Sequence, residues 1–379
     1  MRRRYILAEF KDSANGFVRQ VLPQKSAATL RWNATSSAYL TLKDNHPVIA
    51  SLLTGAGTRC AVWMVEIDGA TLATRRLLEG RVGSLSGNDA PHGTVTVPVF
   101  DDFADLSSVL GWQAPAAAIT GQGVAEFDRY NGPSDTNALA AITANAARLG
   151  KDWDVAASAG LGTVGPLELR MDKLADKILT ALINDRLQLT IERDTATGRW
   201  DVAVRQGQTY PRPLTPQSGV LQKWSWVKQP PTATRCVVGG HGTGVDREYT
   251  LVIDTALEAE LGVALEMHVN ATGAGVGADL APYGWEALAA AAGKAGLTAV
   301  LRETSWFRFP DAYDLGDVVP IQIGALEIED VITQIEITHE AGSGFSVVPT
   351  VGLATADPQA RLVGFIQNVA TSVAGLERG

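Results

Sequence analysis

Two glycine-rich runs have the residue types that could bind a phosphate. Residues 160–165 read Gly-Leu-Gly-Thr-Val-Gly. This is the spacing of a dinucleotide-binding loop, whose glycines let backbone amides approach a pyrophosphate at a helix N-terminus. Here Pro166 and the extended residues 167–169 separate the loop from the helix expected after it, and no parallel β/α series follows. We therefore expect a structural loop that binds no nucleotide.

The second run, residues 239–244, reads Gly-Gly-His-Gly-Thr-Gly and lacks the Lys-Ser/Thr pair with which a P-loop holds phosphate and magnesium. Its simplest role is a wide β-turn. The nearest approach to a hydrolase nucleophile elbow is Ser158. The first glycine of that motif, which permits the strained turn, is replaced by Ala156. Neither run predicts catalysis.

Other polar residues do not form a recognisable reaction centre. Glu327 and Glu329 share a face of an expected strand, as a glycosidase pair could, but like charges on an edge or solvent face are the commoner explanation. Cys60 and Cys236 lie in apolar runs and are expected to be buried. We predict no catalytic residue, no cofactor and no metal site, because the histidines are far apart and form no H-E-x-x-H motif: His46, His92, His241, His268 and His339.

Length and charge exclude several classes of protein. A chain of 379 residues suggests two or three domains. A net charge of -9 without a long basic run argues against a surface that binds nucleic acid. No stretch approaches the roughly 18 uninterrupted apolar residues of a membrane span, and charges interrupt residues 1–11 before a signal-peptide core could form. We expect a protein that is made in the cytoplasm and does not insert into a membrane.

Residues 1–112 are expected to form a β-rich domain. Short runs of β-branched and aromatic residues, such as 38–42 and 59–67, alternate with turn residues. Asp68-Gly69 predicts a tight hairpin turn. Apolar residues at helical spacing in 100–110 predict a short helix that closes the domain.

Residues 113–216 are expected to be an inserted α/β domain. The periodicity predicts helices over 136–149 and 169–187, followed by strands at 187–192 and 200–204. The proline-rich stretch 210–216 is typical of a stiff connector.

Residues 217–355 return to short strands, with one helix predicted at 285–295 and Gly296 as its stop. The last segment, 356–379, is predicted to be a helix with a seam of about two heptads. Packing against its own domain and a threefold seam both fit this spacing. The candidate seam residues are Leu362, Ile366, Val369, Val373 and Leu376.

A five-residue motif carries a resemblance to a known class. Residues 313–317 resemble the Y-D-L-G-D-x-V signature of siphophage tail hub and tail-associated proteins. Physically the motif predicts a turn that feeds a strand, in which an aspartate caps the bend and the glycine takes a positive φ. Its residues are Tyr313, Asp314, Leu315, Gly316 and Asp317.

A second run strengthens the resemblance. Residues 231–249 are similar to the P-T-x-V-x-V-x-G-x-G-x-G-x-x-R run of the Gp37-like family of actinobacterial phages. Its matching positions are Gly240, Gly242, Gly244 and Arg247. The resemblance covers most of the chain, as a pattern of residue types more than as long identity.

The resemblance implies a β-rich α+β fold with two tail-tube-like β-barrel domains (residues 1–112 and 217–355), the inserted small α/β domain and the C-terminal helix. It implies a homotrimer at the virion tail tip, whose six barrels continue a hexameric tail tube in a closed ring. The protein would be a structural baseplate hub, not an enzyme. It would join the distal tail or tail tube protein and the tape-measure protein to other minor tail proteins or a tail fibre. The segment after Asp317 is expected to hold no appended peptidase.

The net charge motivates one further hypothesis, that an acidic lumen lets DNA pass without specific binding. Two alternative functions stay open. One is a tail-associated cell-wall hydrolase. The other is a host-carbohydrate-binding tail module, for which exposed tryptophans would be the clue. Most of the nine tryptophans lie in apolar contexts, which favours packing in the core.

Overall fold

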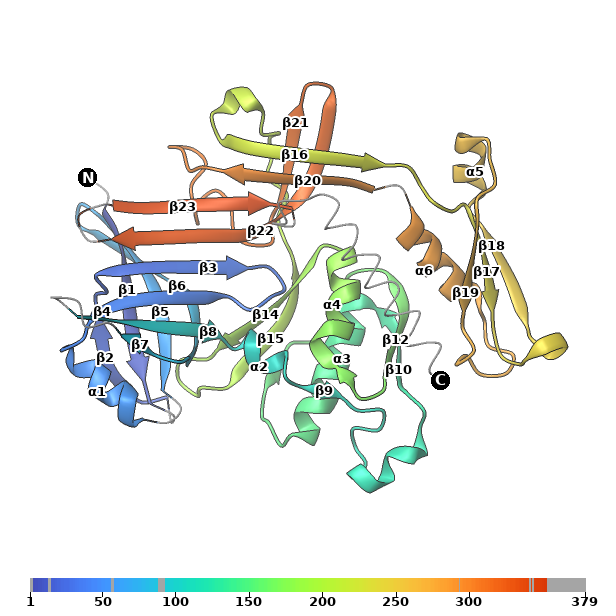
Figure 1. Cartoon of the computed structure of the whole chain (residues 1–379), viewed down its shortest axis with the longest axis horizontal. Coiled ribbons are helices and arrows are strands. Elements are labelled where there is room, and N and C mark those ends of the chain that lie inside the picture. Colours follow the sequence, from blue (N-terminus) through green and yellow to red (C-terminus); the bar gives the residue numbers. More distant parts are fainter. Residues whose placement is uncertain are drawn as a thin grey trace. The chain divides into compact units, whose positions relative to one another are not determined.

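The computed structural model describes residues 3–12, 15–55, 58–87, 93–292, 294–340, 342 and 344–352. The chain divides into two compact units (Figure 1). Unit 1 comprises Met1–Gln222 and Val300–Val351, and unit 2 comprises Lys223–Ala299 and Gly352–Gly379. The domain limits expected at residues 112, 216 and 355 stay a prediction. The predicted C-terminal helix and its candidate seam residues lie outside the described residues.

Unit 1 is built around one long, mostly antiparallel sheet. Its strands are β1 (Arg3–Lys11), β2 (Phe17–Val21), β3 (Lys25–Arg31), β4 (Ser37–Lys43), β5 (Arg59–Asp68), β6 (Thr71–Val82), β7 (Ser86–Gly87), β8 (Thr94–Asp101), β21 (Val318–Ile323), β22 (Leu326–Glu340) and β23 (Gly344–Val351). Within this unit the strand order is β23-β22-β3-β4-β8-β6-β5-β1-β2, with β21 beside β22 and β7 beside β8. The helix α1 (Pro47–Thr54) connects β4 to β5.

The strands form where apolar and polar residues alternate, because successive side chains point to opposite faces of a sheet. In β1, Ile6, Ala8 and Phe10 are fully buried. The hairpin predicted at Asp68-Gly69 is confirmed: β5 pairs with β6 up to Asp68, and Gly69 adopts a φ of 61°. Positive φ costs glycine little, since it has no Cβ.

The β-rich α+β class is confirmed, but no closed barrel is found among the described strands. The strand order is open, and β2 at its end pairs only with β1. Strands expected in two separate barrels share one sheet instead, because β22 pairs with β3 from Gln334 opposite Arg31 to Glu340 opposite Lys25. These two strands are about 300 residues apart in the sequence, so no local sequence pattern predicts that they pair.

Unit 2 contains a three-stranded sheet covered on one face by a helix. Its elements are β17 (Arg235–Gly239), β18 (Tyr249–Ile253), α5 (Thr255–Leu261), β19 (Glu266–Asn270) and α6 (Ala281–Ala291). The sheet order is β18-β17-β19, with β18 antiparallel and β19 parallel to β17. The helix packs on buried Cys236 and Val238. It spans Ala281–Ala291 instead of the predicted 285–295, with Pro282 in its first turn, and Gly296 is not its stop, because residues 294–301 form a strand.

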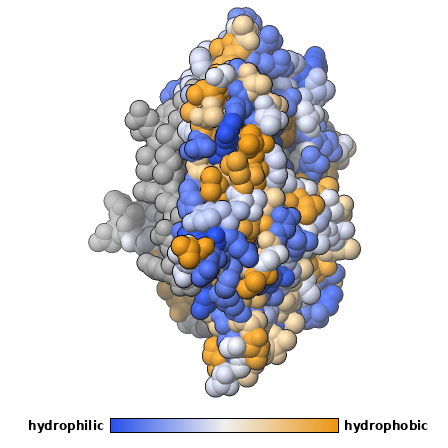
Figure 2. All heavy atoms as spheres, turned by 90° about the vertical axis from the view of Figure 1, so that its right-hand side faces the viewer, coloured by the Kyte–Doolittle hydropathy of each residue, from blue (hydrophilic) through white to orange (hydrophobic). Residues whose placement is uncertain are grey.

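Two strands, β16 (Leu221–Gln229) and β20 (Lys294–Leu301), contain the points where the chain passes between the units. Within the described residues, no helix combines the length and the apolar character needed to cross a membrane. Figure 2 shows one face of the molecule, where hydrophobic residues lie in several separate groups among hydrophilic ones.

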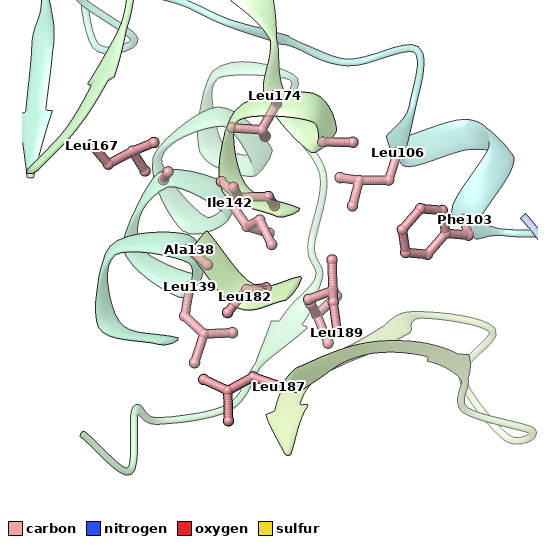
Figure 3. Close-up of a cluster of buried hydrophobic side chains, with 14 of the residues drawn as sticks. Phe103, Leu106, Ala138, Leu139, Ile142, Leu167, Leu174, Leu182, Leu187 and Leu189 are labelled. Carbon is pink, nitrogen blue, oxygen red and sulfur yellow. The ribbon is translucent and has the colours of Figure 1, made fainter. Parts of the chain in front are cut away.

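The α/β part of unit 1 has its own core. It comprises α2 (Phe103–Leu106), β9 (Leu110–Gly111), β10 (Asp128–Pro133), α3 (Ser134–Arg148), β11 (Asp154–Val155), β12 (Val164–Leu169), β13 (Asp172–Lys173), α4 (Leu174–Asn184), β14 (Leu187–Arg193) and β15 (Trp200–Gln206). Ile142 of α3 and Leu174 and Leu182 of α4 point into one buried cluster, to which α2 adds Phe103 and Leu106 (Figure 3).

The helix predicted over 136–149 is confirmed as α3. The one predicted over 169–187 starts later, at Leu174, because Asp172 and Lys173 pair with β9. The helix predicted over 100–110 shortens to four residues, since Asp101 still belongs to β8 and Leu110 pairs with Lys173. The predicted strands 187–192 and 200–204 are confirmed as the hairpin β14–β15.

Candidate functional site

The signature Tyr313–Asp317 forms a tight turn directly before β21. The Asp317 carboxylate accepts hydrogen bonds from the backbone amides of Asp314 (2.7 Å) and Gln208 (2.9 Å). Burial raises the pKa of this carboxyl above its usual range. Gly316 adopts a φ of 89°, as expected from the motif, and its amide donates to the carbonyl of Ile332 at 2.9 Å. The turn is thus bonded both to β22 and to the segment that follows β15.

A cluster of aromatic side chains packs against the turn. Tyr313 is 2% exposed and stacks on Phe307, with ring centroids 4.3 Å apart. Phe309 lies 6.0 Å from the Tyr313 ring, and Tyr210 meets Phe307 edge-on at 5.3 Å. Burial raises the pKa of the Tyr313 hydroxyl, which has no hydrogen-bond partner among the described residues. The ring, not the hydroxyl, is therefore what this position contributes.

Buried charges hold the aromatic segment on the sheet. Arg4 of β1, 6% exposed at its side chain, forms ion pairs with Glu66 (2.8 Å) and Glu303 (2.9 Å). Its guanidinium also donates to the carbonyl of Phe309 at 2.8 Å, and Arg308 reaches Glu66 at 3.0 Å. Buried charges persist only when paired and hydrogen-bonded, so this network ties residues 303–309 to β1 and β5.

The turn is also joined to the α/β part of unit 1. Arg205 of β15 donates to the carbonyl of Leu315 at 3.2 Å and to the Gln188 side chain of β14 at 3.1 Å. A Cβ added at Gly316 would lie 2.3 Å from that glutamine oxygen. On the sheet side, the Arg75 guanidinium of β6 contacts the Asp314 carboxylate at 2.5 Å and covers the Phe309 ring at 4.9 Å. The signature is the junction between the long sheet and the α/β part.

Sequence reasoning missed two members of this junction. Asn33, in the turn between β3 and β4, is 6% exposed and adopts a φ of 52°. Its amide donates to the carbonyl of Leu187 and its oxygen accepts from the amide of Leu189, both at 2.8 Å. Asn tolerates left-handed backbone, which was a usable local signal. No local signal marks Arg4, because its partners lie 62 and 299 residues away.

The second signature run lies in unit 2, in the loop between β17 and β18. Arg247 folds back over the sheet and donates to the carbonyl of Gly239 at 3.1 Å and to the side chain of Asn270. It also lies 5.5 Å from the Tyr249 ring centroid. A Cβ on Gly239 would meet the guanidinium at 2.5 Å, so the glycine makes room for the arginine.

The other glycines of this run shape the loop itself. Gly242 and Gly244 have φ values of 96° and 58°. A Cβ on Gly240 would lie 2.5 Å from Leu280, so a larger residue there would displace a core side chain. The loop is closed by backbone bonds from Gly240 to Glu248 and from Glu248 to His241. It is the connection of a β-hairpin, as its sequence predicted.

The loop 160–165 is held by two acidic side chains, Asp135 in the first turn of α3 and Asp185 directly after α4. The Asp135 carboxylate accepts from the hydroxyl of Ser158 (3.0 Å) and the amide of Ala159 (2.9 Å). Asp185 accepts from the amide of Thr163 at 2.9 Å and from its hydroxyl at 2.7 Å. A pyrophosphate would need the amides that these carboxylates already occupy. These bonds give the loop a structural role in the α/β part of unit 1.

The remaining candidate residues have ordinary structural surroundings. Cys60 and Cys236 are fully buried, as predicted, and burial raises the pKa of both thiols. Glu327 and Glu329 lie exposed on β22. The ring of His46 accepts from the amide of Val48 at 3.2 Å and so caps α1. No group of three or more His, Cys, Asp or Glu is placed to hold a metal ion within the described ranges.

The fold is shared with phage tail proteins of known structure. The 43 kDa tail protein of prophage MuSo2 from Shewanella oneidensis aligns with a TM-score of 0.53 and 15% identity, covering 92% of this chain and 98% of that chain. Prophage tail protein gp18 from Listeria monocytogenes EGD-e aligns with a TM-score of 0.54 and 9% identity, covering 98% and 99%. At these identities the likeness is one of fold.

The sequence itself identifies the family. Residues 24–353 match the Siphovirus ReqiPepy6 Gp37-like protein family, and the chain therefore belongs to this family. No curated protein matches the sequence. The family is described by a siphovirus protein, and the fold is the one seen in the two prophage tail proteins. The resemblance inferred from the two signature runs is thus confirmed.

Proposed function

We propose that the chain is a structural component of a siphovirus tail and forms the trimeric baseplate hub at the tail tip. The observation that carries the proposal is the family match over residues 24–353, joined to a fold shared along nearly the whole chain with two tail proteins. The site supports it chemically. Its buried polar groups bond mainly to one another, which stabilises shape and leaves no paired nucleophile and base in the signature turn.

In this role the hub joins the tail tube protein and the tape-measure protein to other minor tail proteins or a fibre. Open sheet ends support an assembled ring, because an unpaired edge presents backbone donors and acceptors to another strand. The tube-like barrels expected from the family would then be completed between copies rather than within one chain. With a net charge of -9, such a ring is proposed to let DNA slide through without binding it.

The mass of the full chain in solution tests the proposal. Light scattering after size-exclusion chromatography is expected to give about three times the chain mass of 40.1 kDa. Negative-stain imaging of virions with an antibody-labelled chain is expected to show label at the tail tip. Label along the tail shaft or on the capsid would overturn the hub assignment. Clearing of peptidoglycan in a zymogram would instead favour the hydrolase.

A second function, carbohydrate binding, is favoured by one observation. Trp224 and Trp226 are 41% and 50% exposed. They are two positions apart on β16, so both indole rings lie on the same face of the strand. Exposed aromatic rings can stack on the apolar face of a sugar. If this function holds, cell-wall polysaccharide will quench tryptophan fluorescence in the native chain but not after Trp224→Ala with Trp226→Ala. The control variant is Trp285→Ala, which removes an equally exposed ring from α6.

A further inference from the structure

The end strand of the unit 1 sheet, β2, exposes an apolar surface. Among the described strands it pairs only with β1 (Figure 1). Phe17 is 66%, Val18 36% and the adjoining Leu22 64% exposed, and the first four residues of β2 are exposed on both faces of the strand. A hydrophobic edge of this kind is a template for another strand, and soluble proteins normally cover it or place charges on it.

The charge carried by β2 and by the chain after it is basic, although Glu9 of the neighbouring β1 accepts from the Gln20 side chain at 3.1 Å. Residues 13–43 contain no Asp or Glu. Arg19 forms no ion pair with a described residue, and Lys25 has one exposed, loose pair with Glu340 at 3.7 Å. Asp12 precedes the strand, but its carboxylate accepts the backbone amide of Gly16 at 2.7 Å. The edge therefore presents apolar side chains with an unpaired positive charge.

Unit 2 has a free edge of complementary character at β18. This strand pairs only with β17 among the described strands, and side chains on the face of the sheet away from α6 are exposed. Tyr249 is 59% and Leu251 50% exposed, and Val245 in the preceding loop is 99% exposed. Asp246 and Glu248 are exposed beside it without an ion pair to a described residue. Arg247 does not offset them at the edge, because it turns inward over Gly239.

We propose that β2 of one copy of the chain adds to the β18 edge of unit 2 in a second copy. Both strands are five residues long, so the pairing would satisfy backbone groups along their full length. In the antiparallel register that places Gln20 opposite Thr250, Phe17 would lie opposite Ile253 and Val21 opposite Tyr249, aromatic–aliphatic cross-strand pairs of the kind that stabilise sheets. Arg19 would lie opposite Leu251, three positions from Glu248, and its positive charge and the acidic residues before β18 favour the encounter.

The contact is heterologous, since each copy offers one edge of each kind. Repeating such a contact generates a ring when the rotation between copies closes. The inference rests on the proposed function only in taking the partner to be a second copy of this chain.

Charge reversal in the full-length chain tests the contact. Arg19→Glu and Glu248→Lys are each expected to weaken self-association about threefold, because each turns the attraction between the basic β2 edge and the acidic start of β18 into a repulsion. The chain that carries both changes is expected to recover the native mass, since the pair is then reversed. Arg212→Glu makes the same charge change on the exposed connector and serves as the matched control. Native-like mass in both single variants would overturn the proposal.

Cysteine cross-linking separates this inference from the proposed function. A Gln20→Cys chain mixed with a Thr250→Cys chain and oxidised with copper phenanthroline in air is expected to form a covalent dimer on a non-reducing gel. The native thiols are fully buried, so they do not compete. Lys151→Cys, exposed after α3, replaces Gln20→Cys as the control and is expected to give no dimer with Thr250→Cys.

The mass measurement and the cross-linking experiment together separate the β2–β18 contact from the proposed trimer. A native chain that assembles but does not cross-link through these two positions would refute the β2–β18 contact and leave the trimer standing. A native chain that is monomeric by mass but cross-links through them would refute the trimer and keep the contact.

Discussion

The two signature runs of the family are held in opposite ways. In unit 1, the Tyr313–Asp317 turn is contacted by side chains from β6, β14 and β15, and its tyrosine is 2% exposed. In unit 2, the loop between β17 and β18 is held by its own backbone bonds and by Arg247, and Val245 at its tip is 99% exposed. The first turn joins parts of one fold, whereas the second displays a surface.

This difference in burial predicts a difference in energetics. A buried residue that is truncated loses transfer free energy and leaves a cavity, while an exposed loop residue loses little. Changes in the unit 1 turn should therefore destabilise the chain strongly, and equivalent changes in the unit 2 loop should affect contacts with partners more than stability.

The largest effect is expected from Tyr313→Ala. Removing the ring that stacks on Phe307 should lower the free energy of unfolding by about 3–5 kcal/mol. Urea unfolding followed by circular dichroism measures it. Tyr313→Phe keeps the ring and removes a hydroxyl without a described partner, so it should change stability by less than about 1 kcal/mol. A cost below about 1 kcal/mol for the alanine variant would refute the assignment of this turn as a junction.

The second-largest effect is expected from substituting a glycine in the unit 1 turn. The same substitution in the unit 2 loop allows a direct comparison of the two environments. Gly316→Ala combines a φ of 89° with a contact at 2.3 Å to Gln188, which Arg205 holds in place, and should cost about 2–3 kcal/mol. Gly244→Ala has a φ of 58° but open space around its Cβ, and should cost about 1 kcal/mol. Equal costs in urea unfolding would mean that the backbone angle alone matters and that the crowding at Gly316 relaxes freely.

A pH effect is expected from Asp101, at the end of β8. Burial raises the pKa of its carboxyl to about 7, against 3.8 for an ordinary aspartate. Between these values the folded chain keeps a proton that the unfolded chain has released, so stability falls as pH rises from about 4 to about 7. Asp101→Asn removes this loss. The variant should exceed the native chain by about 1–2 kcal/mol at pH 8 and match it near pH 4.

The measurement is urea unfolding of both chains at the two pH values. The backbone amide of Ser36 donates to the Asp101 carboxyl at 3.0 Å, and the amide oxygen of asparagine can accept the same bond. A stability difference that does not change with pH would show that the carboxyl titrates normally.

The smallest effect is expected from Arg247→Ala in unit 2. Its guanidinium contacts a carbonyl, an amide oxygen and an aromatic ring, and it forms no ion pair with a described residue. Its loss should cost about 1 kcal/mol or less. A cost as large as that of Tyr313→Ala would show that the unit 2 loop is as integral to its fold as the unit 1 turn.

Much of the local structure was predictable, for a local reason. Helix α3, the hairpin at Asp68-Gly69 and the positive φ of Gly316 were all expected, because periodicity and turn chemistry depend on residues near one another. The limits of α2 were not, since Leu110 pairs with Lys173 of β13, more than 60 residues later. The signature residues were recognisable as a motif, but their roles as a junction were not.

The sequence by itself determined the β-rich class, the turns, the main helices and the family of this protein, because these follow from neighbouring residues and short motifs. Only the tertiary structure decided that β22 pairs with β3, that Arg4 lies between Glu66 and Glu303, and that Arg247 folds over Gly239. Such contacts depend on which distant segments exclude water together. The free energy of burying these surfaces depends on the assembled segments, so no local sequence pattern predicts it.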